Sequence, residues 1–174
     1  KNLDMLIPTL EYVAHQRPKA RLLFVGDFEY RETLEQLAAE SEFPERITFT
    51  GAIPRENLGV AYAAMDVFVF PSLKDTQGWV LHEAPLAGLP VVLLDKGVTS
   101  AVVEGENGFY VENSPEAVSE KIIELLTDGA LRIAMGKKSE QIASEFTEER
   151  QVGKLIELYE RVIENHQSLR ELEQ

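Results

Sequence analysis

Short apolar runs alternate with segments of helical periodicity along most of the chain. Segments that place apolar residues three and four positions apart, at residues 3–10, 34–38 and 58–62, are typical of amphipathic helices. Between and after them, runs rich in β-branched and aromatic residues predict buried strands at residues 21–26, 47–50, 67–71, 91–95 and 109–111. This alternation predicts an α/β fold, a doubly wound Rossmann-like parallel sheet with helices on both faces.

After the last predicted strand the pattern becomes wholly helical. Ser114 followed by Pro115 is a helix-start signal, and residues 130–146 and 147–168 predict two further C-terminal helices. The chain opens on a helical pattern at Lys1, whereas sheets of this kind usually open with a strand. We therefore expect a first strand, and a whole preceding domain, upstream of Lys1.

Composition narrows the classes of function. A length of 174 residues fits one domain, here residues 1–174, and the formal net charge of −13 disfavours a nucleic-acid partner. The absence of cysteine excludes disulfides, thiolate metal sites and a cysteine nucleophile. The three histidines are far apart in sequence and none has a second histidine at metal-ligand spacing, so we expect no metal site, with His82 beside an aspartate or glutamate as the alternative. No apolar run approaches the roughly 18 residues of a membrane span, and we expect a cytoplasmic protein.

The stretch PSLKDTQGWVLHEA, residues 71–84, follows the third predicted strand directly. Ligands of open parallel sheets bind beyond the carboxyl ends of the strands, which is where this turn would lie. Gly78 allows close backbone approach, and we expect the amides of Gly78, Trp79 and Val80 to be unpaired at the start of a helix. Unpaired amides and a positive helix end together make an anion site.

Two carboxylates frame this glycine turn. Glu83 lies about one turn inside an apolar helix, where a buried carboxylate needs a partner, and it could accept hydrogen bonds from two vicinal hydroxyls. Asp75 would reach another part of the same ligand. One anion site with two separate hydroxyl acceptors describes a nucleoside diphosphate sugar, although a structural turn with a half-exposed glutamate and a capping aspartate explains the same residues.

The stretch FPSLKDTQGWVLHEAPLAGLPVVLLD resembles the donor-binding C-terminal domain of retaining glycosyltransferases with the GT-B fold (group 1, family 4-like). That family carries a strand, P-S, a Glu-seven-residues-Glu element containing a glycine, and then E-A-x-A-x-G-x-P-V-V. Other family segments resemble, in the same order, RLLFVGD, ITFTGAIPRENLGVAYAAMDVFVFPS, GVTSAVVEGENGFYV and FTEERQVGKLIELY. Asp75 stands in the first acidic position, where glutamate is commoner, and Gln77 stands where an aromatic residue is frequent.

The resemblance implies a role for each matching residue. Glu83 would hold the ribose hydroxyls and Asp75 the hydroxyls of the transferred sugar, and both would belong to the catalytic site. The remaining donor contacts would come from Lys1 at the diphosphate, Ile53 and Arg55 at the base, and Thr76, Gln77, Gly78, Trp79 and Val80 in the loop and helix start. His82 is expected to pack beneath the site, and Trp79 either to shield the diphosphate loop or to fill core.

The resemblance also implies an activity. It is the metal-independent transfer of a sugar from a UDP- or GDP-sugar to a lipid or polysaccharide acceptor, with retention of configuration and no cofactor. The acceptor would be held by an N-terminal domain outside this chain, which would also place the enzyme at the membrane surface, and the isolated chain would be inactive. Two alternatives are a nucleotide-sugar epimerase of the same fold and a non-catalytic nucleotide-binding module.

Overall fold

All strand pairs of the protein are parallel in the part of the chain that the structure describes. The computed structural model describes residues 1–75, 78–94 and 96–172, with the backbone alone for residues 164–172. One sheet pairs β1 with β2, and a second has the order β3-β4-β5. The strands are β1 (Leu22–Phe24), β2 (Ile47–Phe49), β3 (Phe68–Phe70), β4 (Val91–Leu93) and β5 (Gly108–Tyr110).

Every strand overlaps one of the five predicted runs, and the α/β prediction is confirmed. The paired segments are shorter than most of the runs, because the chain leaves the hydrogen-bonded ladder before the apolar pattern ends. Within the described residues no strand pairing joins the two sheets. The further strand expected from the sequence stays a prediction.

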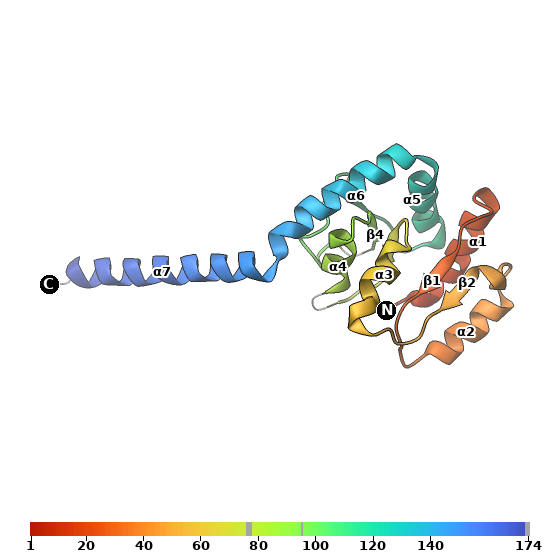
Figure 1. Ribbon diagram of the computed structural model, residues 1–174, viewed down its shortest axis with the longest axis horizontal. Helices are drawn as coiled ribbons and strands as arrows, with labels where there is room; N and C mark the ends of the chain where they lie inside the picture. The colour runs from red at the N-terminus through yellow and green to blue at the C-terminus, as the bar shows by residue number, and fades with distance from the viewer. Residues whose placement is uncertain (76–77, 95, 173–174) are drawn as a thin grey trace.

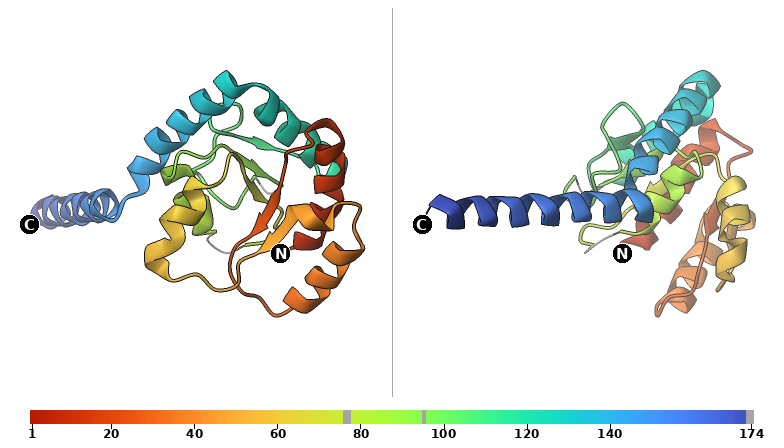
Figure 2. Two further views of the ribbon diagram at one scale, coloured as in Figure 1. Left: turned by 45° about the vertical axis from the view of Figure 1, so that its right-hand side comes forward. Right: turned by 60° about the vertical axis from the view of Figure 1, so that its left-hand side comes forward.

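Helices lie on both sides of the sheets (Figure 1; Figure 2). Their bounds are α1 (Leu6–Gln16), α2 (Arg31–Glu40), α3 (Leu58–Ala63), α4 (Val80–Leu86), α5 (Pro115–Thr127), α6 (Gly129–Ala143) and α7 (Glu148–Leu172), with 3-10 turns η1 (Leu3–Met5), η2 (Pro44–Arg46), η3 (Arg55–Asn57) and η4 (Ser144–Phe146).

The central strand β4 is buried on both faces. Val91 and Leu93 belong to a cluster with Leu81 of α4, whereas Val92 belongs to a cluster with Val118 of α5. Because successive side chains of a strand point to opposite faces, this division requires one helical layer above β4 and another below it.

Two helix contacts position the layers. On one side α1 packs against α5, and Tyr12 Oη donates a hydrogen bond of 2.5 Å to Glu116 Oε1. On the other side α6 packs against α4 and the turn that follows it, where Ser139 Oγ donates to the Leu89 carbonyl at 2.7 Å. The approach is close, because a Cβ atom on Gly136 would lie 2.3 Å from the carbonyl oxygen of Gly88.

The starts of α5 and α6 have side-chain caps. Ser114 Oγ accepts from the amide of Ala117 at 3.1 Å, which confirms the helix start predicted from Ser114 and Pro115. Asp128 caps α6 in the same way, by accepting from the amide of Leu131 at 2.9 Å. Each cap pairs one of the amides that a helix start leaves without an intrahelical partner.

Helix α7 extends away from the rest of the protein (Figure 1). Its described apolar side chains are about half exposed and recur at three and four spacings, and they are Val152, Leu155, Ile156, Leu158, Tyr159, Val162 and Ile163. No described helix is both long and apolar enough to cross a bilayer.

Candidate functional site

The connection from β3 to α4 lies at the carboxyl end of β3. Pro71 and Ser72 continue buried from the strand, and Ser72 Oγ donates to the carbonyl of Lys74 at 3.0 Å. The chain then turns through Gly78 into α4. This is the edge of an open parallel sheet at which ligands are usually bound.

Lys1 reaches this connection from the other end of the sequence. Its Nζ donates to Asp75 Oδ2 at 2.8 Å, and it lies 5.9 Å from the ring centroid of Phe70. The lysine side chain is 63% exposed, whereas the aspartate side chain is 12% exposed. An ion pair this open contributes less than about 1 kcal/mol to stability, so its main consequence is to hold a cation beside the loop.

The amide of Gly78 is not unpaired, so the sequence-based expectation for it is wrong. It donates to Asp75 Oδ1 at 3.0 Å, because the glycine takes a φ of +50° and the aspartate three residues earlier acts as a cap. Among the described residues, the amides of Trp79 and Val80 have no acceptor within hydrogen-bonding distance. Two donors therefore remain at the start of α4.

Glu83 is half-buried on α4 and has a protein partner. Tyr62 of α3 donates its hydroxyl to Glu83 Oε2 at 2.8 Å. Burial of the ring, and then the bond to the carboxylate, raise the pKa of Tyr62 well above its usual value. The other carboxylate oxygen, Oε1, has no hydrogen-bond partner among the described residues.

Tyr62 is the site residue that the sequence reasoning missed. Its position on the apolar side of a helical pattern indicated only a core residue. A signal was present, since a buried tyrosine hydroxyl usually finds a partner and Glu83 required one. To predict this pair one must know that α3 packs on α4, where Tyr62, Ala84 and Leu89 form one buried cluster.

The side chains of His82 and Trp79, near the start of α4, differ in burial. The His82 ring lies 5.1 Å from the ring of Phe146 and 6.3 Å from that of Trp79, which fits the expected packing role. Burial lowers the pKa of His82, and its Nδ1 atom is buried without a described hydrogen-bond partner. Trp79 is 67% exposed, so the alternative that it fills core is wrong.

The remaining predicted contacts are only partly located. Ile53 is half-buried and Arg55 is exposed at the start of η3, and no described contact joins either residue to the β3–α4 connection. Thr76 and Gln77 lie outside the described residues. In the part of the chain that the structure describes, no three histidine, aspartate or glutamate side chains gather as a metal site would require.

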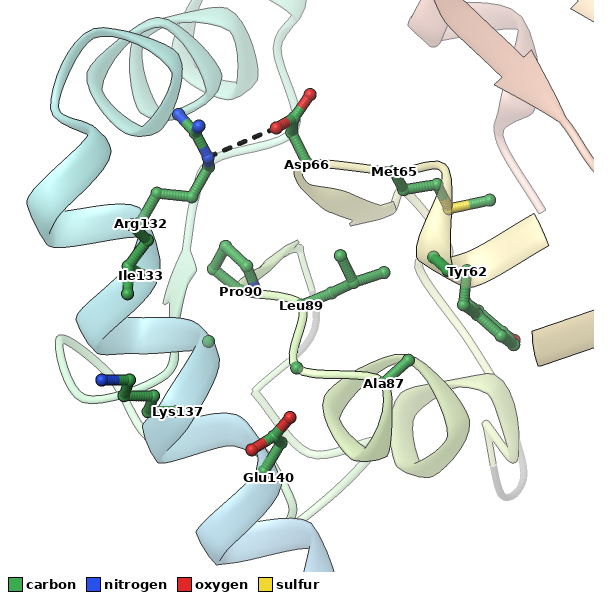
Figure 3. A pocket seen from close by; sticks show the side chains of 13 residues that line it. Tyr62, Met65, Asp66, Ala87, Leu89, Pro90, Arg132, Ile133, Lys137 and Glu140 are labelled. Carbon is green, nitrogen blue, oxygen red and sulfur yellow. Dashed lines mark ion pairs between the residues drawn. The ribbon is translucent and has the colours of Figure 1, made fainter. Parts of the chain in front are cut away.

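A cavity lies at the amino ends of β3 and β4. It measures about 300 Å³ and is lined by α3, the turn before β4 and α6 (Figure 3). Asp66 and Arg132 face each other across one end at 3.4 Å, while Lys137 and Glu140 lie farther along α6. Tyr62 is among the residues that line this cavity, and its hydroxyl bonds to Glu83.

Comparison with known proteins places the chain in a family. Residues 1–142 match the family described as glycosyl transferases group 1. Since these residues are most of the chain, the protein belongs to that family. The parallel sheets with helices on both faces are those of the C-terminal domain of GT-B glycosyltransferases.

Two curated relatives illustrate the similarity. The chain is 34% identical over 144 residues to the sulfoquinovosyl transferase SQD2 of Arabidopsis thaliana, which covers 80% of this chain and 28% of that protein. It is also 34% identical over 144 residues to the GDP-mannose-dependent monoacylated alpha-(1-6)-phosphatidylinositol monomannoside mannosyltransferase of Corynebacterium glutamicum, covering 78% and 37% of the two chains. The chain thus spans about a third of the length of these relatives.

A solved structure agrees with this assignment. Sucrose-phosphate synthase of Thermosynechococcus elongatus superimposes with a TM-score of 0.77 at 30% identity. The match covers 91% of this chain and 42% of the synthase.

Proposed function

We propose that this chain is the donor-binding domain of a two-domain glycosyltransferase. It binds a nucleoside diphosphate sugar at the β3–α4 connection, and a further domain holds the acceptor. The reaction is a metal-independent transfer of the sugar with retention of configuration. Membership of the glycosyltransferase family supports the reaction class, and the GDP-mannose dependence of one relative supports a nucleotide-sugar donor.

The observation that carries the proposal is the environment of Glu83. A half-buried carboxylate has one oxygen held by Tyr62 and the other without a hydrogen-bond partner among the described residues, one turn inside the helix that follows β3. An ionised carboxylate can accept two hydrogen bonds from neighbouring hydroxyls. We assign Glu83 to the ribose hydroxyls of the donor.

The diphosphate is assigned to the start of α4. The amides of Trp79 and Val80, and the ammonium of Lys1, supply donors and positive charge on a chain whose net charge is −13. Negative charge develops on the diphosphate as the bond to the sugar breaks, and groups already oriented toward it stabilise that charge. Lys1 and the α4 amides therefore act most strongly on the leaving group.

The sugar is assigned to the β3–α4 connection and the base to the residues at the start of η3. Asp75 holds hydroxyls of the transferred sugar from its position beside Lys1. Ile53 and Arg55 border the base, and Thr76, Gln77 and Gly78 complete the loop around the donor. The base is that of UDP or GDP.

The acceptor is assigned to a second domain. The half-exposed apolar side chains of α7 support this, because a helix with one apolar face usually packs that face against another element. The phosphatidylinositol mannoside in the name of one relative supports a lipid acceptor, and a polysaccharide is the other class that the family suggests.

The experiment that tests the proposal is nucleotide binding by wild type and by Glu83→Gln. Thermal shift and saturation-transfer NMR with UDP, GDP and ADP, and with their sugars, should detect binding of at least one nucleotide. Glu83→Gln should weaken that binding about 10- to 100-fold, because a hydrogen bond to a charged group contributes about 1.5–3 kcal/mol.

The matched control is Glu140→Gln, at the rim of the cavity at the opposite end of β3. It removes the same charge and should leave nucleotide affinity unchanged. Equal affinities of both variants and wild type would contradict the ribose assignment. No binding of any of these nucleotides by wild type would contradict the function itself.

A further inference from the structure

The Tyr62–Glu83 hydrogen bond joins a buried tyrosine ring to a half-buried carboxylate. Tyr62 is 9% exposed and packs with Ala84 and Leu89, with its ring centroid 6.1 Å from that of Phe68. Apolar contacts therefore fix the ring independently of the hydrogen bond that its hydroxyl makes. Its hydroxyl then crosses from α3 to α4 and reaches a carboxylate 21 positions away.

The direction of the hydrogen bond is fixed by chemistry. Burial and the neighbouring carboxylate raise the pKa of Tyr62, so the phenol keeps its proton at any physiological pH. A carboxylate can only accept, and Tyr62 therefore always donates to Oε2. Hydrogen bonds to an ionised acceptor are stronger than those between neutral groups.

The consequence is a glutamate whose side chain is held at one oxygen. An unrestrained glutamate samples several rotamers and must lose that freedom when it binds a ligand. With Oε2 held by a fixed phenol, Oε1 is left without a described partner and can accept a hydrogen bond from a ligand hydroxyl. Groups oriented in advance bind more tightly than groups that must be ordered on binding.

We propose that Tyr62 is a positioning residue for Glu83 and that the pair makes the site selective for ribose over deoxyribose. This proposal rests on the proposed function, in which Glu83 binds the ribose of a nucleoside diphosphate. A site built to hydrogen-bond substrate hydroxyls discriminates strongly against an analogue that lacks them. Tyr62 itself makes no contact with the donor and acts through the orientation of Glu83.

The test compares each nucleotide with an analogue that Glu83 cannot recognise. The probe is whichever of UDP, GDP and ADP the wild-type chain binds most tightly, together with its 2′,3′-dideoxy analogue. Dissociation constants are measured for wild type, Tyr62→Phe, Glu83→Gln and the double variant. Tyr62→Phe should weaken binding of the ribonucleotide about 3- to 10-fold and leave binding of the dideoxy analogue unchanged. In the Glu83→Gln background Tyr62→Phe should have no further effect.

The chain supplies a matched control and a second variant. Tyr12→Phe removes the other tyrosine hydroxyl that donates to a glutamate, at the exposed contact with Glu116, and should change neither affinity. Glu83→Asp withdraws the carboxylate by one methylene from both Tyr62 and the ribose, so it should reduce the ribose preference at least as much as Tyr62→Phe does.

The outcomes separate the two proposals. If wild type binds none of these nucleotides, the proposed function fails. If Glu83→Gln leaves the ratio of the two dissociation constants unchanged, the ribose assignment of Glu83 fails, and in either case the role of Tyr62 fails with it. If Glu83→Gln removes the preference for ribose while Tyr62→Phe retains it, Glu83 binds ribose and the positioning role of Tyr62 is refuted.

Discussion

The two ends of β3 differ in what their polar groups do. At the carboxyl end, Lys1, Asp75 and Gly78 form one connected set, and one oxygen of Glu83 has no described hydrogen-bond partner. At the amino end, side chains and the Gly88–Gly136 backbone contact line the cavity between α3 and α6, and Asp66 and Arg132 face each other at one end (Figure 3).

We therefore assign ligand binding to the carboxyl end of β3 and support of the fold to its amino end. Polar groups that are held in place but can still form a hydrogen bond can bind a ligand, whereas glycine contacts between backbones fix the layers of the fold. Substitutions at the amino end should therefore change stability without changing nucleotide affinity. Substitutions at the carboxyl end should change affinity more than stability.

The largest effect is expected at Gly136. A Cβ there would lie 2.3 Å from the Gly88 carbonyl oxygen, and neither backbone can move without shifting α6 from α4. Gly136→Ala should lower the free energy of unfolding by about 3 kcal/mol, toward the upper end for overpacking. Thermal unfolding should then occur about 6–12 °C lower.

Gly153→Ala in α7 is the control for Gly136→Ala. A Cβ at Gly153 has nothing within 4 Å, so alanine should leave stability unchanged or raise it by up to about 1 kcal/mol. The folded Gly136→Ala protein should bind nucleotide as wild type does. Weakened binding would show that the amino end also shapes the site and would break the comparison.

A smaller loss of stability is expected at Gly78, together with a loss of affinity. Its φ of +50° is strained for alanine, and a Cβ would lie 3.0 Å from Leu81 Cδ1. Gly78→Ala should lower stability by about 1–2 kcal/mol and also weaken nucleotide binding, because the start of α4 must shift. Unfolding curves and nucleotide titrations measure the two effects separately.

Gly105→Ala carries the same backbone strain away from the site. Its φ is +74°, and a Cβ there meets nothing within 4 Å. If both variants lose similar stability but only Gly78→Ala loses nucleotide affinity, the comparison of the two ends of β3 is sharpened. Equal affinities in the two variants would place the donor away from the start of α4.

The smallest effect is the pH dependence contributed by His82. Burial lowers its pKa in the folded protein, so the unfolded chain binds more protons between the folded and unfolded pKa values. Stability from this group is complete above the unfolded pKa of about 6.5 and decreases as pH falls through that value. Wild type should therefore lose more stability than His82→Gln between pH 7.5 and 5.5 in chemical denaturation. His15→Gln, at an exposed histidine, is the control, and equal losses in wild type and His82→Gln would contradict the role of burial.

The sequence predicted the strands well because each one is a local signal. An uninterrupted apolar run is typical of a strand buried on both faces, and β4 has one in Val91, Val92 and Leu93. The glycine turn and the two carboxylates were also readable, since the special backbone of Gly78 and the isolated charge of Glu83 are properties of single positions.

The contacts inside the site could not be predicted in the same way. The bond from Gly78 to Asp75 depends on how the loop turns, and the bond from Tyr62 to Glu83 depends on how α3 packs on α4. Neither arrangement follows from spacing. From the sequence we considered a ligand or a half-exposed position for Glu83, whereas the structure supplies a tyrosine for one of its two oxygens.

The packing of α1 against α5 affects how the protein is made. On the ribosome α1 emerges before the five strands, but the helix that covers its apolar side, with Leu6, Leu10 and Val13, is synthesised only after all of them. At translation rates of about 5–20 residues per second, that side waits on the order of ten seconds for its partner. During this interval α1 is a natural target for chaperones and for mistaken association between nascent chains.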